Sequence, residues 1–241
     1  MPYQENGLIA ARQLWIAGVV TLAFTALARW LRGVTFSGAL AGAAICFLMY
    51  AAAGPGAVAT LALVFVLTWA TTRLGYSRKK RLGTAENQQG RTAAQVLANL
   101  SVAAGCAVFS ASSGMSIFLL GAVAALSEAA ADTVSSELGQ AHSEKARLIT
   151  NWKAVPAGTS GGVSGTGTAA GIAAAVLVSF FAARVALFPT KLLGTSVFAA
   201  ALGMIADSFL GATLEKKHLL NNNGVNFLST LLAAIVAMLL G

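Results

Sequence analysis

The chain has 241 residues, of which 57% are apolar and 10% are charged, and its mean hydropathy is +0.75. Soluble globular domains are typically about 25% charged, so this composition excludes a disordered chain and argues against a water-soluble domain. Sixteen Lys and Arg against eight Asp and Glu give a net charge of +8. In so apolar a chain, the excess of cations indicates membrane topology rather than a nucleic-acid partner. Cys46 and Cys106 lie inside apolar runs, which excludes a disulfide framework or a zinc site.

Eight apolar runs are long enough to cross about 30 Å of hydrocarbon as helices. They cover residues 13–30, 36–53, 56–72, 92–110, 115–131, 162–186, 192–214 and 225–240. These runs take up most of the chain and predict an all-α polytopic membrane protein, with a single transmembrane domain over residues 1–241 and no soluble domain. Within the first run, Ala26-Leu27-Ala28 is typical of a signal-peptidase site, whereas the cations Arg29 and Arg32 favour a retained span.

The Lys and Arg residues segregate between alternate loops of these eight spans. Thirteen of the sixteen fall on one side: Arg29, Arg32, Arg73, Arg78, Lys79, Lys80, Arg81, Arg91, Lys145, Arg147, Lys153, Lys216 and Lys217. The positive-inside rule predicts that this side is cytoplasmic and that both termini lie outside. The run Arg78–Arg81 is typical of an orientation signal that contacts anionic lipid. Because the loops of the other side are short turns of small residues, we expect the function at the cytoplasmic face.

Carboxylates occur near the inner ends of two predicted spans. Glu128 and Asp132 are four residues apart, which places them on one face of a helix, and Asp207 lies about two turns from the end of the seventh span. Acidic side chains in a membrane helix are costly unless they face a cation or a polar cavity. Carboxylates together with substrate phosphates suit Mg²⁺, so we predict that these three residues are its ligands. A solvated helix end is the alternative for the first pair.

A glycine-rich segment lies between the two acidic strings. Five glycines and several hydroxyls occupy residues 158–167, after Lys153 and directly before the sixth span. Unpaired N–H groups at a helix N-terminus attract anions, which favours phosphate binding here. The candidate ligands are Gly158, Thr159, Gly161, Gly162 and Ser164, with Lys153 adding charge. Close helix packing is the alternative, and we expect it for the later glycines Gly167 and Gly171.

Polar side chains recur at helical spacing on two further spans. They are Arg91, Gln95 and Asn99 on the fourth span and Asn222, Asn223 and Asn226 at the start of the eighth. Such amides either hold helices together, at about 0.6–2 kcal/mol each, or bind a nucleotide. Arg73 ends the third span, where it is either a phosphate ligand or an interfacial anchor.

The ordered set of motifs resembles one integral-membrane family. The motifs are Gly90-Arg91-Thr92-Ala93-Ala94-Gln95 with Asn99, Asp132-Thr133 through Ser136-Glu137-Leu138-Gly139, Val155-Pro156 through Gly158-Thr159 and Gly161-Gly162-Val163-Ser164, and Asp207-Ser208 through Gly211. From about residue 33 to residue 241, the chain is similar to the family that contains the plastid phytyl-phosphate kinase of tocopherol synthesis.

The resemblance implies transfer of the γ-phosphate of a nucleoside triphosphate, typically CTP, to a prenyl monophosphate such as phytyl or geranylgeranyl phosphate. The cofactor would be Mg²⁺, with Asp132, Asp207 and Lys153 as the catalytic residues and Arg91, the glycine turn and the amides around the nucleotide. A prenol kinase, a cytidylyltransferase and a transporter for a small solute or ion are the alternatives. The chain opens without a recognisable organelle-targeting segment, so a bacterial plasma membrane is the expected location.

Overall fold

The structure is a computed structural model that describes residues 2–143 and 145–241, with side chains described from residue 12 onward. The helices are α1 (Pro2–Trp30), α2 (Phe36–Arg73), α3 (Tyr76–Leu82), α4 (Ala93–Ser113), α5 (Ile117–His142), α6 (Gly165–Arg184), α7 (Leu193–Leu210) and α8 (Asn222–Leu240). A 3-10 turn, Thr190–Leu192, precedes α7, and a π-helical segment, Gly211–Glu215, follows it. Seven of the described helices are long and apolar enough to span a membrane, which confirms the all-α membrane fold.

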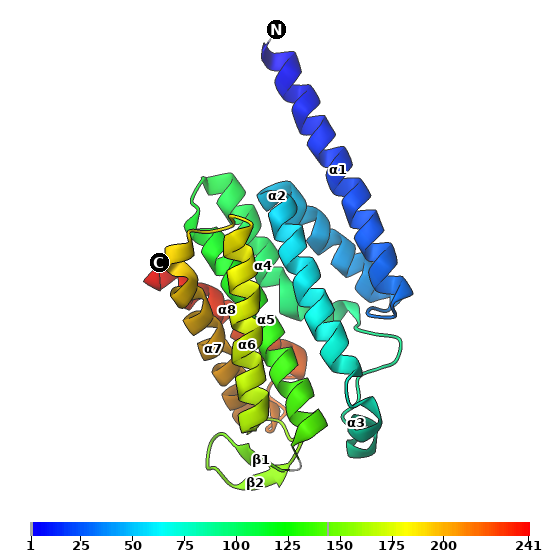
Figure 1. Ribbon diagram of the computed structural model, residues 1–241, viewed down its shortest axis with the longest axis vertical. Coiled ribbons are helices and arrows are strands. Elements are labelled where there is room, and N and C mark those ends of the chain that lie inside the picture. Colours follow the sequence, from blue (N-terminus) through cyan, green and yellow to red (C-terminus); the bar gives the residue numbers. More distant parts are fainter. Residues whose placement is uncertain (1, 144) are drawn as a thin grey trace.

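Helix α2 contains two of the predicted spans. Its 38 residues are interrupted at Gly54, whose φ of 75° and ψ of −168° are not helical. Glycine tolerates this positive φ, and Pro55 after it has no N–H to donate, so the helix breaks here. Figure 1 shows the first half of α2 rising and the second half returning. The eight predicted crossings are therefore present within the seven long helices.

Helix α5 is the centre of the bundle and packs against α4, α6, α7 and α8. Small residues let the neighbouring backbones come close. A Cβ added at Gly167 of α6 would lie 2.6 Å from Ser135 O, and one at Gly171 would lie 2.8 Å from Ala131 O. Close packing therefore accounts for the later glycines, as we expected.

Three departures from the predicted boundaries lie at one end of the bundle. Helix α5 continues to His142, so the expectation that it ends at residue 131 is wrong. The next residues form an antiparallel sheet, in the order β2-β1-β3, from β1 (Lys145–Leu148), β2 (Ala154–Pro156) and β3 (Gly162–Val163). Helix α3 lies in the predicted loop 73–91. Hydropathy locates the part of a helix that lies in lipid, whereas the helix itself continues into water.

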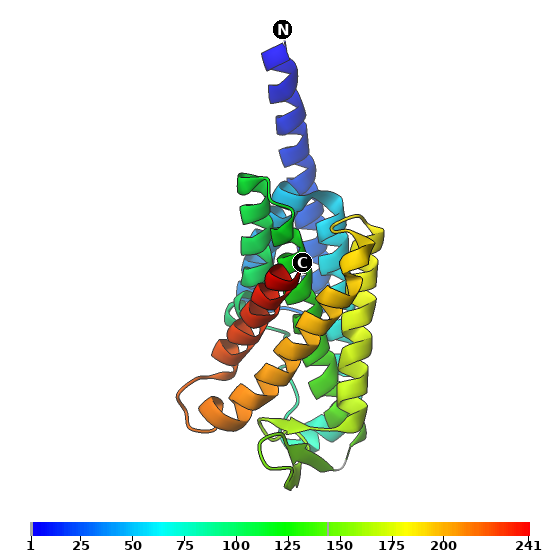
Figure 2. The ribbon, with the colours of Figure 1, turned by 90° about the vertical axis from the view of Figure 1, so that its left-hand side faces the viewer.

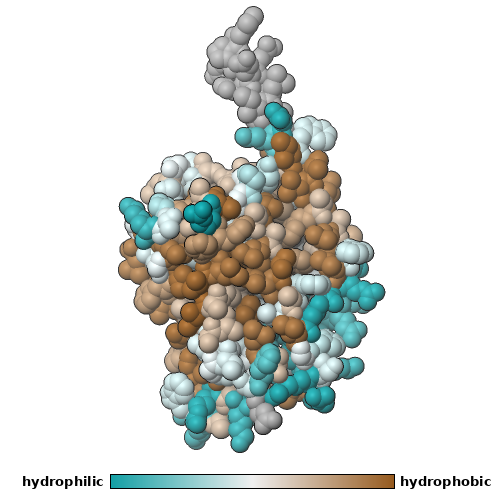
Figure 3. Space-filling view, in the orientation of Figure 1, coloured by the Kyte–Doolittle hydropathy of each residue, from teal (hydrophilic) through white to brown (hydrophobic). Residues whose placement is uncertain are grey.

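The surface matches a protein embedded in lipid. Figure 3 shows a brown belt of apolar residues around the middle and most of the teal residues near the end that carries α3 and the sheet. Figure 2 shows that both chain ends lie toward the opposite end from the sheet. This arrangement is the one expected for an even number of crossings.

Candidate functional site

The three predicted carboxylates meet inside the bundle and form what we call the acidic cluster: Glu128, Asp132 and Asp207. The first two lie one turn apart on α5, and each of the three carboxyl groups is close enough to another to interact with it electrostatically. Glu128 is 1% exposed, and its Oε1 has no hydrogen-bond partner among the described residues. Gly203 of α7 leaves room for Glu128, since a Cβ there would lie 2.6 Å from Glu128 Cγ.

Such a cluster is electrostatically unfavourable unless a cation or a proton balances it. Burial removes the water that would screen the carboxylates from one another. Ser229 on α8 offers partial compensation, because its Oγ donates to Asp207 Oδ2 over 3.3 Å. We infer that the cluster is maintained for binding rather than for stability.

Two predicted amides form a chain that ends at the acidic cluster. With the Asn226 amide turned to satisfy its neighbours, its nitrogen donates to Asp207 Oδ2 over 3.1 Å and its oxygen accepts from Asn99 Nδ2 over 3.1 Å. Asn99 is 5% exposed and also donates to Gln95 O over 2.9 Å. This chain joins α4, α7 and α8 and fixes the orientation of one Asp207 oxygen.

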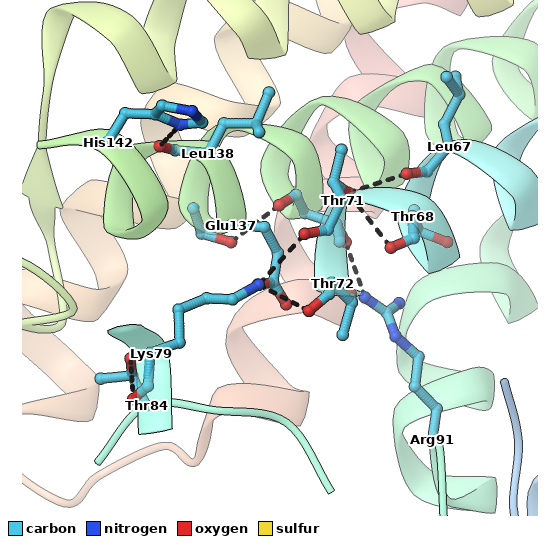
Figure 4. Close-up of polar contacts among 12 residues, drawn as sticks. Leu67, Thr68, Thr71, Thr72, Lys79, Thr84, Arg91, Glu137, Leu138 and His142 are labelled. Carbon is cyan, nitrogen blue, oxygen red and sulfur yellow. Dashed lines mark hydrogen bonds and ion pairs between the residues drawn. The ribbon is translucent and has the colours of Figure 1, made fainter. Parts of the chain in front are cut away.

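Arg91 places a cation beside the cluster. Its guanidinium donates to Thr133 Oγ1 over 3.1 Å and interacts electrostatically with Asp132. Figure 4 shows the side chain reaching from the segment before α4 toward the other polar groups. The Arg91 backbone is held by Gly33, whose carbonyl accepts from Arg91 N over 3.0 Å. Gly38 allows this approach, since a Cβ there would lie 2.1 Å from Arg91 O.

Glu215 is an acidic residue of the site that the sequence analysis did not select. It interacts electrostatically with both Asp132 and Asp207. Glu215 ends the π-helical segment Gly211–Glu215, a wider turn that is frequent at functional sites. The signal in the sequence was its spacing of eight residues from Asp207, which places both on one helix face.

The glycine turn, residues 158–164, lies against the segment that carries Glu215. Gly161 has φ of 76°, and a Cβ there would lie 2.4 Å from Ala212 Cβ. Gly158 has φ of 88° and packs against Thr84, whose Cγ2 would lie 2.4 Å from an added Cβ. The structure therefore brings the turn to the end of α7, next to the acidic residues.

Some polar groups of the glycine turn already have partners within the chain. The Thr159 hydroxyl donates to Pro156 O over 2.8 Å. Ser164 caps α6 and accepts from Gly167 N over 3.1 Å. Gly162 N donates to Thr159 O over 2.8 Å. These contacts shape the turn, and its phosphate contacts stay a prediction.

Three other predicted residues have different surroundings. Lys153 is exposed in the turn between β1 and β2. Gln95 caps α4, with its Oε1 accepting from Thr92 N over 2.8 Å. Asn223 lies half-buried in the first turn of α8. A structural role is therefore visible for Gln95, and the roles of Lys153 and Asn223 in nucleotide binding stay predictions.

Arg73 is held at the end of α2. One guanidinium nitrogen donates to Leu31 O, and the group lies 4.7 Å from the centre of the Trp69 ring. Arginine has five N–H donors, so this contact leaves others available. The position suits either an anchor or a phosphate ligand.

Lys79 corrects the interpretation of Arg78–Arg81 as a lipid-facing surface. Its side chain is fully buried, and its Nζ pairs with Glu137 of α5. The same ammonium donates to Thr71 O over 3.1 Å and to Thr72 O over 2.6 Å, as Figure 4 shows. Lys79 therefore fastens α3 to the ends of α2 and α5.

Two hollows are lined by residues that interact with the cluster, Arg91 and Asn99 in the first and Glu215 in the second. The first, which we call the apolar chamber, has a volume of about 370 Å³ and lies between α1, α2 and α4. Its walls include Phe24, Ala28, Gly42, Leu61, Phe65 and Leu100. The second, the polar cleft, is more open, with a volume of about 800 Å³. It is lined by Thr159, Ser160, Glu215, Lys216, His218, Leu219, Leu220, Asn221 and Asn222.

The acidic cluster has the donor chemistry for Mg²⁺ without a closed set of ligands. Its donors are carboxylate oxygens, and one of them, Glu128 Oε1, is buried without a partner among the described residues. Across those residues, no group of three or more His, Cys, Asp and Glu side chains is already arranged to hold a metal ion. Mg²⁺ commonly uses one or two carboxylates and completes its coordination with water and substrate phosphates. The metal role of these residues stays a prediction.

Fold and site together define a polytopic helical membrane protein with a buried acidic cluster. The chain belongs to the integral membrane protein family DUF92, whose model matches residues 19–234. This confirms the family resemblance that the motifs indicated.

The family relatives come from plants, archaea and cyanobacteria. The chain is 33% identical over 227 residues to Protein VTE6, chloroplastic, of Arabidopsis thaliana, covering 86% of this chain and 65% of that protein. It is 33% identical over 176 residues to membrane protein MJ0933 of Methanocaldococcus jannaschii, covering 73% and 72% of the two chains. It is 35% identical over 197 residues to membrane protein sll0875 of Synechocystis sp., covering 79% and 76%. The chain thus spans just under two thirds of the VTE6 length, and no solved structure matches it.

Proposed function

We propose that the protein is a membrane-embedded kinase that transfers the γ-phosphate of a nucleoside triphosphate, CTP by family resemblance, to a prenyl monophosphate. The observation that carries this proposal is the proximity of Glu128, Asp132 and Asp207 to one another and to Arg91, together with an apolar chamber lined by Arg91 and a polar cleft lined by Glu215. The proposed reaction joins a phosphate on a lipid to a water-soluble triphosphate, so it requires an apolar site and a polar site close to each other.

The reaction requires positioning and charge neutralisation more than acid–base chemistry. An acceptor phosphate oxygen attacks the γ-phosphorus, the bond from the γ-phosphorus to the bridging oxygen breaks, and the nucleoside diphosphate leaves with that bond's electrons. The acceptor is already an anion, so no general base is needed. Mg²⁺, when bound, supplies positive charge to the transferred phosphoryl group. Arg91 adds a fixed cation at the same place.

The nucleotide would enter through the polar cleft. Thr159 and Ser160 line one wall, and Lys216 and His218 line the other. Glu215 belongs to the cleft and also interacts with Asp132 and Asp207. A triphosphate in this cleft would therefore extend toward the acidic cluster, with backbone donors of the glycine turn along its path.

The cation distribution supports a cytoplasmic location for this end of the bundle. Thirteen of sixteen Lys and Arg residues fall in the loops that join the spans here. The positive-inside rule places such loops in the cytoplasm, where nucleoside triphosphates are available. We propose a bacterial plasma membrane with both termini outside.

The central packing favours an enzyme over a transporter. Ser127 of α5, Ser179 of α6 and Ser196 of α7 are buried and bond to one another, with two oxygen–oxygen distances of 2.9 Å. Their hydroxyls thus satisfy one another rather than lining an aqueous path. Val123 and Val178 beside them are buried apolar residues. A transporter would need polar groups that continue through this layer.

The test is a product assay with purified protein in lipid vesicles. The protein is incubated with Mg²⁺, each nucleoside triphosphate, and a panel of prenyl alcohols and monophosphates. We expect a prenyl diphosphate and CDP in equal amounts. Release of pyrophosphate would identify a cytidylyltransferase, and phosphorylation of alcohols alone would identify a prenol kinase. If no substrate pair reacts, the proposed activity is wrong.

A further inference from the structure

The apolar chamber has the properties of a binding site for a lipid chain. Phe24 and Ala28 of α1, Leu61 and Phe65 of α2, and Leu100 of α4 supply apolar surface around it. Its volume of about 370 Å³ falls in the range of about 300–1,000 Å³ that is typical of ligand sites. The same chamber reaches the loop before α4, because Glu86, Asn87 and Gln88 also line it, so it combines apolar helix faces with a polar end.

The polar residues of the chamber make it suitable for an anion at one end. Arg32, Arg73 and Arg91 line it, and Glu86 is the one acidic residue among its lining. Glu86 accepts a hydrogen bond from the Gln95 amide. Three guanidinium groups against one carboxylate leave a net positive charge, and guanidinium matches phosphate geometry well.

The chamber connects with the acidic cluster through shared residues. Arg91 lines the chamber and interacts with Asp132. Asn99 lines it as well and lies at the head of the amide chain that ends on Asp207. Ala129, next to Glu128 on α5, also belongs to the lining. An anion at the arginines is therefore next to the groups that we assign to phosphoryl transfer.

We propose that the apolar chamber is the acceptor site, where the isoprenoid chain lies between α1, α2 and α4 and its monophosphate binds Arg32, Arg73 and Arg91. This inference rests on the proposed function and adds the place and orientation of the acceptor. The acceptor phosphate is then next to the acidic cluster through Arg91 and Asn99, and the nucleotide is next to it through Glu215. In-line transfer requires the attacking and leaving oxygens to lie on either side of one phosphorus, and in our proposal these two oxygens come from the two substrates.

The occupant that we propose is an isoprenoid monophosphate, the acceptor of the proposed reaction. The apolar walls suit a hydrocarbon chain, and the arginines suit one phosphate group. A phosphatidic acid carries the same kind of anion on two acyl chains, so competition by it is the outcome that distinguishes the two lipids.

Photolabelling tests the site without relying on turnover. Full-length protein in phosphatidylcholine vesicles is irradiated, without nucleotide, with farnesyl monophosphate that carries a diazirine at the far end of its chain. We expect labelled peptides from the segments around Phe24, Gly42 and Leu61. Excess geranylgeranyl monophosphate should suppress the label, and geranylgeraniol, which lacks the phosphate, should suppress it much less. Phosphatidic acid should not compete.

Two glycine substitutions provide a matched pair. Gly42 lines the chamber and Gly105 does not, and an added Cβ would have no neighbour within 4 Å at either position. Gly42→Leu should lower labelling by about tenfold or more, because its side chain takes the space of the isoprene units. Gly105→Leu should label like the unaltered protein and should show that a leucine in a membrane helix is tolerated.

The outcomes separate this inference from the kinase assignment. Three outcomes would overturn the acceptor site even if the kinase is active. They are equal labelling of Gly42→Leu and Gly105→Leu, labels spread over all lipid-facing helices, and efficient competition by phosphatidic acid. Chamber labelling that the monophosphate suppresses, in a protein that forms no diphosphate, would support the lipid site and refute the kinase.

Discussion

At the scale of single residues, Glu128 is a buried carboxyl group whose presence is not explained by packing. It is a carboxylate with 1% exposure, close to two further carboxylates, in a helix whose other buried residues are mostly small and apolar. Replacing buried charged groups by well-packed apolar residues is often neutral or stabilising, so packing alone does not account for a carboxyl group at this position. In the proposed function, its partner is Mg²⁺.

Glu128→Gln should separate stability from activity. The amide keeps the shape of the side chain and removes one of three mutually repelling charges, so the metal-free protein should melt a few degrees higher. About 1 kcal/mol corresponds to about 2–4 °C in a chain of this size. Turnover should be lost, as it should in Asp132→Asn and Asp207→Asn.

Thermal unfolding in chelator and in Mg²⁺ checks this prediction. Mg²⁺ should raise the melting temperature of the unaltered protein and should have a smaller effect on Glu128→Gln, because one ligand is missing. A variant that melts lower than the unaltered protein in chelator and still turns over normally would show that Glu128 is a packing residue.

At the scale of elements, the glycine turn packs closely against the π-helical segment that follows α7. Gly161 combines φ of 76° with a Cβ position 2.4 Å from Ala212 Cβ. Gly83, which ends α3, has a similar φ of 73° and no atom within 4 Å of the Cβ position. The two glycines thus share a backbone requirement and differ in their surroundings.

Gly161→Ala should reduce turnover by about tenfold or more, since the methyl group pushes the turn away from the residues near Glu215. Gly83→Ala should cost about 1 kcal/mol of stability through its backbone strain and leave turnover near normal. Steady-state rates over a range of nucleotide concentrations provide the measurement. Similar losses in both variants would mean that strain alone, and not the contact with α7, is responsible.

Helix α3 depends on a buried ion pair between Lys79 and Glu137. Lys79→Met should lower stability by about 3 kcal/mol, because it leaves Glu137 largely buried without its cation. Adding Glu137→Gln should restore part of the loss, whereas Lys80→Met, at an exposed position, should change stability by less than about 0.5 kcal/mol. Denaturation of the unaltered protein, Lys79→Met, Glu137→Gln, the double variant and Lys80→Met in the same detergent tests this, and additive losses in the double variant would contradict the pairing.

At the scale of the whole molecule, the cations predict the orientation in the membrane. Lys80 lies exposed at the cation-rich end, and Ser112 lies exposed in the last turn of α4 at the other. With Cys46 and Cys106 replaced by Ala, Ser112→Cys should react with an impermeant maleimide in intact bacterial cells. Lys80→Cys should react after permeabilisation. The reverse pattern would invert the topology and place the polar cleft outside the cell.

The sequence was sufficient for the spans and for the shared helix face of Glu128 and Asp132, because apolar length and i, i+4 spacing are local properties. The proximity of Asp207 depends on the packing of α7 against α5, which the sequence does not give directly. The continuation of α5 to His142 was missed, since hydropathy falls where a helix leaves lipid although its hydrogen bonds continue. The burial of Lys79 was missed because four adjacent cations look alike until α3 packs. The chamber could not be predicted, because its walls depend on how α1, α2 and α4 pack against one another.

The chamber wall that α1 provides has a further consequence for the family. The carboxylates lie on α5 and α7, whereas Phe24 and Ala28 belong to a helix whose main partner is α2. Substitutions in α1 therefore change the walls of the chamber without altering the helices that carry the carboxylates. With the acceptor site that we propose, the choice of hydrocarbon chain and the phosphoryl transfer would thus depend on separate helices and could vary independently.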